Sequence, residues 1–248
     1  TNLSNFEKVL EHSNHYINLF PDAINGYENK ALALLKLKQN NDLIKFLDYT
    51  IIKFPDQVFF KYLYGDILIQ FKNYNKAERQ YLSALELSKD SRLVRNSLIT
   101  LYELTENYNK SDSLFNILIL EDENDALTLN NYAYSICERG AIDKDTMYYA
   151  MSLSKKALSI EPQNAAYLDT MGWLYYKIGD YNAAEDFIKN SIEIEGNNSV
   201  VLGHLADIYI KKNQITTALQ YYKKALINDP DNFQIKLKIE KYEKYEKY

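Results

Sequence analysis

Two of the three histidines are placed where they could share a metal ion. His12 and His15 are three residues apart, so both imidazoles would lie on one side of a helix. No third ligand lies near them in the sequence, and the metal-binding patterns HExxH and CxxC do not occur. We therefore expect exposed histidines and predict no metal site.

The single cysteine, Cys137, and the acidic run at 121–123 are the next candidates for chemistry. A cysteine nucleophile needs a nearby base, and none is evident around Cys137, which we expect to be a small, half-buried packing residue. The acidic run falls in an expected turn, where solvated charge is ordinary. The phosphate-binding patterns GxGxxG and GxxxxGK[ST] are absent. We predict a protein that is not an enzyme and binds no cofactor.

The elements that must position these residues follow from an internal repeat. Residues 165–198 and 199–232 are both 34 residues long and align without a gap. Small residues recur at positions 8, 20 and 27, an aromatic residue at position 11, and a helix breaker at position 32. The aligned pairs are Gly172 and Ala206, Ala184 and Ala218, Ser191 and Ala225, Tyr175 and Tyr209, and Gly196 and Pro230.

The same period extends backwards over most of the chain. It divides residues 24–232 into 24–57, 58–91, 92–125, 126–164, 165–198 and 199–232. The unit 126–164 has five extra residues between its helices. Each unit is expected to form two antiparallel helices, such as 165–178 and 181–195. Between these two, Gly179 suits a left-handed C-terminal cap and Asp180 an N-cap. Residues 1–23 would form one helix, either half a repeat or a cap, and residues 233–248 a solvating C-terminal helix.

This pattern resembles the tetratricopeptide (TPR) repeat. The resemblance implies an all-α fold, a right-handed α-solenoid of antiparallel helix pairs, also called a TPR superhelix. In that family the first helix of each pair lines a concave groove that exposes positions 2, 5, 9, 12 and 13. The protein-binding groove residues that the resemblance implies are Phe59, Tyr62, Asp66, Asn96, Asn130, Tyr134, Asp169, Trp173, Tyr176, Lys177, Asp207 and Lys211.

Trp173, the only tryptophan, is open to two interpretations. It could form an exposed aromatic floor with Tyr134 and Tyr176, as interface hot spots often do. The polar ring around this floor would be Asn130, Asp169 and Lys177. Alternatively, it packs between neighbouring first helices. Chaperone-binding TPR domains hold a C-terminal carboxylate with lysines, but positions 2 and 5 of these repeats contain none. We therefore do not expect that ligand.

Residues 126–232 have a narrower resemblance, to bacterial cell-envelope TPR lipoproteins and adaptors. The residues that carry it are the over-long repeat, then YLDTMGWLYYKIGDYNAA, then HLADIYIKK. This resemblance implies a non-catalytic scaffold or adaptor that binds a protein or peptide and takes part in bacterial envelope assembly. It also implies a periplasmic or outer-membrane-anchored location if a leader was removed, and a cytoplasmic one otherwise.

Composition limits the other function classes. The net charge of −5 and a pI near 5.4 argue against nucleic-acid binding, which needs a basic face. No apolar run reaches the roughly 18 residues of a transmembrane segment. Two alternatives stay open: a self-associating structural module, with a homodimer formed through helix 3–19, and an accessory domain of a larger protein. An enzyme would need a catalytic domain outside this sequence.

Overall fold

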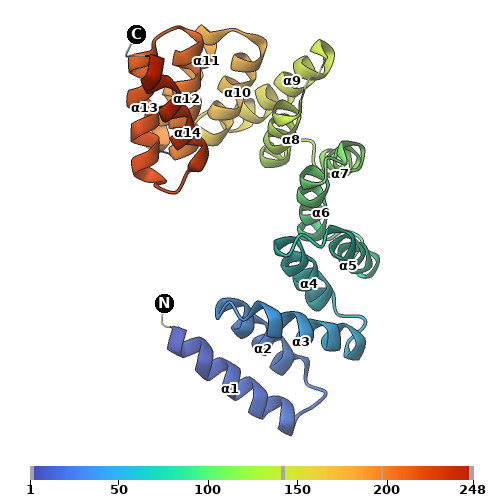
Figure 1. The fold of residues 1–248 in the computed structure, drawn as a ribbon. Helices are drawn as coiled ribbons and strands as arrows, with labels where there is room; N and C mark the ends of the chain where they lie inside the picture. The colour runs from blue at the N-terminus through green and yellow to red at the C-terminus, as the bar shows by residue number, and fades with distance from the viewer. Residues whose placement is uncertain (1–2, 141–142, 197, 246–248) are drawn as a thin grey trace. The chain divides into compact units, whose positions relative to one another are not determined.

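The computed structural model describes residues 3–140, 143–196 and 198–245. The chain divides into two compact units, Thr1–Leu114 and Phe115–Tyr248. Regular structure in the described ranges is entirely helical (Figure 1), which confirms the predicted all-α fold of helix pairs. Each unit is described below by itself.

The first unit begins with a single helix and continues with helix pairs. Its helices are α1 (Leu3–Leu19), α2 (Ile24–Lys36), α3 (Asn40–Lys53), α4 (Val58–Gln70), α5 (Tyr74–Leu87), α6 (Arg92–Leu104) and the start of α7 (Tyr108–Glu121). After α7 the second unit contains α8 (Ala126–Glu138), α9 (Lys144–Ile160), α10 (Ala165–Ile178), α11 (Tyr181–Glu195), α12 (Ser199–Lys211), α13 (Ile215–Asn228) and α14 (Phe233–Tyr245). The bounds of α10 and α11 agree with those expected from the repeat.

Small residues at position 8 of a repeat allow the two helices of a pair to approach closely. A Cβ added to Gly65 on α4 would lie 2.4 Å from Cε1 of Tyr81 on α5. A Cβ added to Gly172 on α10 would lie 2.8 Å from Cδ1 of Ile188 on α11. Ala133 and Ala206 occupy the same position and are fully buried. In the two pairs with glycine at this position, a large side chain of the second helix therefore packs against the gap on the first.

The turns inside five of the helix pairs use a residue with a left-handed backbone. Gly179 ends α10 with φ of 90°, and Asp180 then caps α11 by accepting a hydrogen bond from the amide of Ala183. This agrees with the roles expected of Gly179 and Asp180. Other turns put a side chain at the left-handed position, with φ between 55° and 59°. These residues are Lys38, Lys72, Glu106 and Asn213.

Replacing Lys72 with glycine should raise the free energy of unfolding by about 0.5–1 kcal/mol. The side chain is exposed and forms no hydrogen bond or ion pair with the described residues, so only the backbone preference changes. Urea titration followed by circular dichroism would measure this, with Lys72→Ala, expected to be close to neutral, as the control. A Lys72→Gly variant less stable than Lys72→Ala would contradict the left-handed geometry.

The two terminal helices pack differently from those between them. When the repeat numbering is continued back into α1, Tyr16 occupies position 27. Gly26 on α2 makes room for its ring, because a Cβ added to Gly26 would lie 2.8 Å from Tyr16 Cδ1. On α14, Ile235 and Ile239 are buried against the core formed by α12 and α13. The rest of α14 is largely polar, with exposed lysines alternating with glutamates.

Candidate functional site

The first helices of successive pairs are joined directly by side-chain bonds in the second unit. We call α8, α10, α12 and α14 the first-helix layer of this unit. Trp173 on α10 donates from Nε1 to Glu138 on α8 at 2.6 Å. Asp169 on α10 lies 2.8 Å from Nδ1 of His204 on α12. Lys238 on α14 donates to Asp207 on α12 at 2.6 Å, and thus each helix of the layer is bonded to the next.

Trp173 packs within this layer and is only 8% exposed. Its ring is stacked between Tyr176, with centroids 4.4 Å apart, and His204, with centroids 4.1 Å apart. The Lys177 ammonium lies 5.2 Å from the ring centroid, and Glu138 accepts from the indole nitrogen. The expectation of an exposed aromatic floor centred on Trp173 is therefore wrong. The alternative, packing between first helices, is what the structure shows.

Two of the polar residues expected around Trp173 are also buried. Asn130 on α8 is 5% exposed, and its Oδ1 atom has no hydrogen-bond partner among the described residues. Asp169 is 8% exposed because its carboxylate faces His204. Lys177 is the exposed member of the expected ring, and its Nζ lies 3.6 Å from Glu138. Asn130 and Asp169 can support a ligand-facing surface from beneath but cannot form it.

The cysteine and the remaining tyrosine of this region do not offer a reactive group. Burial raises the pKa of the Cys137 thiol to about 12, so it stays protonated and is no nucleophile at neutral pH. At 1% exposure Cys137 is more buried than expected. Tyr134 is half-buried, and burial, followed by the nearby charges of Glu138 and Asp169, raises its pKa to about 12.

The bonds that His204 and Glu138 make within the first-helix layer were not predicted from the sequence. His204 is buried beneath Trp173 and bonded to Asp169, and Glu138 accepts from the indole. In each bond the two residues are 35 positions apart in the sequence, which is one more than the repeat length. A search for complementary polar residues at about one repeat length would have found both pairs.

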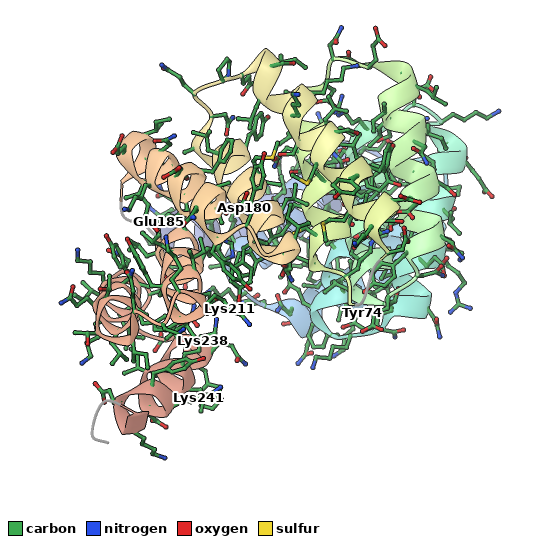
Figure 2. All side chains as sticks on the ribbon, turned by 90° about the horizontal axis from the view of Figure 1, so that it is seen from above. Tyr74, Asp180, Glu185, Lys211, Lys238 and Lys241 are labelled. Carbon is green, nitrogen blue, oxygen red and sulfur yellow. The ribbon has the colours of Figure 1, made fainter. Side chains whose placement is uncertain are left out.

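Asp207 and Lys211 lie one helical turn apart on α12. Asp207 is half-buried and accepts hydrogen bonds from the Tyr222 hydroxyl at 2.5 Å and from Lys238. Lys211 is exposed, at the C-terminal end of the helix. Figure 2 labels Lys211, Lys238 and Lys241 one after another along α12 and α14.

The first helices of the first unit present a second set of expected residues. Phe59, Tyr62 and Asp66 are half-buried on α4, whereas Asn96 is exposed on α6. Asp66 accepts a hydrogen bond from the Tyr81 hydroxyl at 2.5 Å, and burial raises the pKa of the Asp66 carboxyl above its usual range. Burial likewise raises the pKa of Tyr62. The surface that α4 and α6 present is therefore aromatic and polar, without a reactive group.

Tyrosine–carboxylate bonds recur at fixed repeat positions. Within a repeat, the tyrosine at position 24 donates to the aspartate at position 9, in the pairs Tyr81–Asp66 and Tyr222–Asp207. Between repeats, the tyrosine at position 11 donates at 2.9 Å to the glutamate at position 21 of the preceding repeat. These pairs are Tyr102–Glu78 and Tyr209–Glu185. The bonds within a repeat fix the aspartates of the first helices, and the bonds between repeats hold neighbouring helix pairs together.

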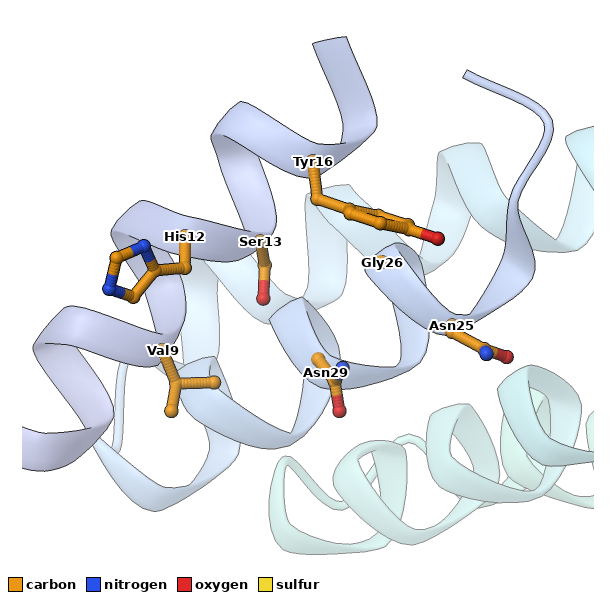
Figure 3. Close-up of a pocket in the computed structure, with 7 residues that line it drawn as sticks. All are labelled: Val9, His12, Ser13, Tyr16, Asn25, Gly26 and Asn29. Atoms are coloured by element: carbon orange, nitrogen blue, oxygen red, sulfur yellow. The ribbon is translucent and has the colours of Figure 1, made fainter. Parts of the chain in front are cut away.

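A shallow pocket of about 440 Å³ lies between α1 and α2 (Figure 3). Its lining contains no carboxylate, lysine or arginine, and none of its residues belongs to the expected groove: Val9, His12, Ser13, Tyr16, Asn25, Gly26 and Asn29. Figure 3 shows the Tyr16 ring reaching from α1 over Gly26. His12 and His15 are exposed, as expected. The pocket offers neither a charged group nor a reactive one.

No helix in the described ranges has both the length and the apolar character needed to cross a membrane.

Comparison with known proteins identifies the repeat. Models of the tetratricopeptide repeat match residues 60–91 and 179–239. An uncharacterized protein of Porphyra purpurea, ycf37, is 30% identical over 146 residues, which cover 52% of this chain and 84% of that protein.

Two solved structures share the fold. One is a tetratricopeptide repeat protein from Parabacteroides merdae, with a TM-score of 0.76, 12% identity and coverage of 96% of this chain and 99% of that one. The other is PilW, a type IV pilus biogenesis factor, with a TM-score of 0.61, 20% identity and coverage of 73% and 84%. At these identities the structures support the fold alone. Taken with the repeat matches and the Porphyra relative, they lead to one conclusion: the chain belongs to the tetratricopeptide repeat family.

Proposed function

We propose that this chain is a non-catalytic scaffold that binds a protein or peptide on the exposed surface of its first helices. TPR proteins bind protein partners and are generally non-catalytic. The observation that carries the proposal is the bonded first-helix layer of the second unit, in which Glu138–Trp173 and Asp169–His204 connect successive helices. A surface that is held in place in this way loses little conformational freedom when a partner binds.

The ligand-facing residues that we propose are the accessible members of the expected set. They are Phe59, Tyr62, Asp66 and Asn96 in the first unit, and Tyr134, Tyr176, Lys177, Asp207 and Lys211 in the second. Trp173 stacks on Tyr176 and lies under Lys177, so it orients these side chains from below. Aromatic side chains with a polar surround are the usual composition of a binding hot spot.

Site-specific photo-crosslinking in the native cells would test this surface. A crosslinking amino acid placed at Asn96, Lys177 or Lys211 should give a discrete adduct with a partner protein. The matched controls are Ile52 and Ile227, which are strongly exposed on second helices. Adducts at the control positions, with none at the first-helix positions, would refute the proposed surface.

We also propose that the partner belongs to an assembly of the bacterial cell envelope. The likeness of the fold to PilW, a type IV pilus biogenesis factor, supports this together with the narrower sequence resemblance of residues 126–232. The crosslinked adducts should then be recovered with the envelope fraction. Adducts found only in the cytoplasm would exclude the envelope role and leave the scaffold role intact.

A further inference from the structure

Two lysines without carboxylate partners lie near the C-terminal ends of α12 and α14, in the first-helix layer of the second unit. Lys211 on α12 and Lys241 on α14 are exposed. Among the described residues, neither forms an ion pair, and the one contact recorded for Lys241 is with the ring of its neighbour Tyr242, 5.1 Å from the centroid. Their charges are therefore available to a ligand.

The ion pair between Asp207 and Lys238 places Lys211 and Lys241 on the same side of that ion pair, towards the C-terminal ends of α12 and α14. Lys211 follows Asp207 by four residues, and Lys241 follows Lys238 by three, so each lies one turn further along its own helix. The bond from Lys238 to Asp207 holds α12 and α14 together at 2.6 Å. Both lysines thus lie just beyond this bond, one on each helix.

Lys177 extends the arrangement to α10. It occupies position 13 of its repeat, as Lys211 does in the next, so equivalent sites on neighbouring first helices both carry an ammonium group. The carboxylates of the same surface are already engaged. Glu138 bonds the Trp173 indole and lies 3.6 Å from Lys177, so its one charge is shared between two partners, and Asp207 bonds Tyr222 and Lys238. An incoming carboxylate would therefore meet cations whose charge is not fully compensated.

Apolar side chains accompany the lysines. Ile210 is half-buried beside Lys211, and Leu237 on α14 is 42% exposed. Tyr176 is half-buried one residue before Lys177. A ligand that presents only charge would leave these apolar groups uncovered, whereas a ligand with alternating acidic and apolar groups would cover both.

We propose that Lys177, Lys211 and Lys241 bind an acidic, extended segment of a protein partner, with apolar side chains between its carboxylates. This rests on the proposed scaffold function and names the chemical class of its partner. Packed helix axes lie about 8–10 Å apart. A peptide in the extended polyproline II conformation has three residues per turn and advances about 3.1 Å per residue, so carboxylates at every third residue lie on one side about 9 Å apart and would match lysines on successive helices.

A protein segment fits this surface better than a nucleic acid. A nucleic acid carries a phosphate on every nucleotide, and some of these phosphates would face Glu138 and Asp207, which lie among the lysines. A peptide can place an uncharged residue opposite each carboxylate.

Fluorescence anisotropy with two labelled peptides and the full 248-residue chain would test the proposal. One 12-residue peptide has glutamate at every third position and leucine between, and the second replaces each glutamate with glutamine. The glutamate peptide should bind at least about tenfold more tightly, and its affinity should fall with added salt. The double variant Lys211→Glu, Lys241→Glu should weaken its binding by about tenfold or more.

The matched control is Lys236→Glu, which makes the same charge change on the opposite face of α14. It should change the dissociation constant by less than about twofold. Circular dichroism would establish that all variants fold. Equal binding of both peptides, equal loss in Lys236→Glu, or tighter binding of a 12-nucleotide uridine RNA would each overturn the proposal. If crosslinks form at Lys177 and Lys211 while the acidic peptide does not bind, the scaffold function stands and this partner chemistry is wrong.

Discussion

Replacing Gly65 with alanine should lower the free energy of unfolding by about 2–4 kcal/mol. The new Cβ would lie 2.4 Å from Cε1 of Tyr81, a distance that real Cβ contacts do not show. Tyr81 is fully buried, and its hydroxyl is bonded to Asp66, so the ring cannot move aside without losing burial and that bond. The higher helix propensity of alanine offsets about 1 kcal/mol at most. Chemical denaturation followed by circular dichroism would measure the loss.

Gly203→Ala is the matched control for this change. Gly203 also lies inside a first helix, but its added Cβ would meet only Ile235 Cδ1, at an ordinary contact distance of 3.8 Å. The variant should gain about 0.5–1 kcal/mol from helix propensity. The two variants should thus change stability in opposite directions. A neutral or stabilising Gly65→Ala would show that the helices of that pair do not approach as closely as described.

Trp173→Ala should lower the free energy of unfolding by about 3–5 kcal/mol. The substitution removes a ring that is stacked on both Tyr176 and His204, and it leaves a cavity between α10 and α12. Since Trp173 is the only tryptophan, unfolding must be followed by circular dichroism and not by indole fluorescence.

Trp173→Phe separates packing from hydrogen bonding at this position. It keeps an aromatic ring in the stack but cannot donate to Glu138, and it should cost about 1 kcal/mol or slightly more. Glu138 is 46% exposed at its side chain and can be solvated instead. If both variants were as stable as the parent chain, Trp173 would not be packed between the helices.

The repeat period was sufficient to predict the helices but not the burial of individual side chains. The bounds of α10 and α11 could be predicted because Gly179 and Asp180 end one helix and begin the next through local backbone chemistry. The close approach of α4 and α5 at Gly65 could be predicted in a similar way, from the small residue at position 8 of the repeat. Exposure at position 9, by contrast, depends on residues of neighbouring repeats.

Trp173 shows why exposure at position 9 could not be predicted from the repeat pattern. At this position the other repeats have Leu32, Asp66, Thr100, Tyr134 and Asp207, all of which have smaller side chains than tryptophan. The indole is large enough to stack on His204 of the following repeat and to donate to Glu138 of the preceding one. Its burial depends on two partners 31 and 35 residues away in sequence, and no local pattern encodes that.

The tyrosine–glutamate bond between repeats determines which segment of this chain could be copied in tandem. A bond across a new junction needs glutamate at position 21 of one copy and tyrosine at position 11 of the next. Residues 165–198 contain both, as Glu185 and Tyr175, so consecutive copies would be joined as Glu185 and Tyr209 now join two repeats. A second copy of 199–232 would meet Leu219 at that place and lack the bond. Gene duplication could therefore lengthen this protein most readily at the repeat that contains Trp173.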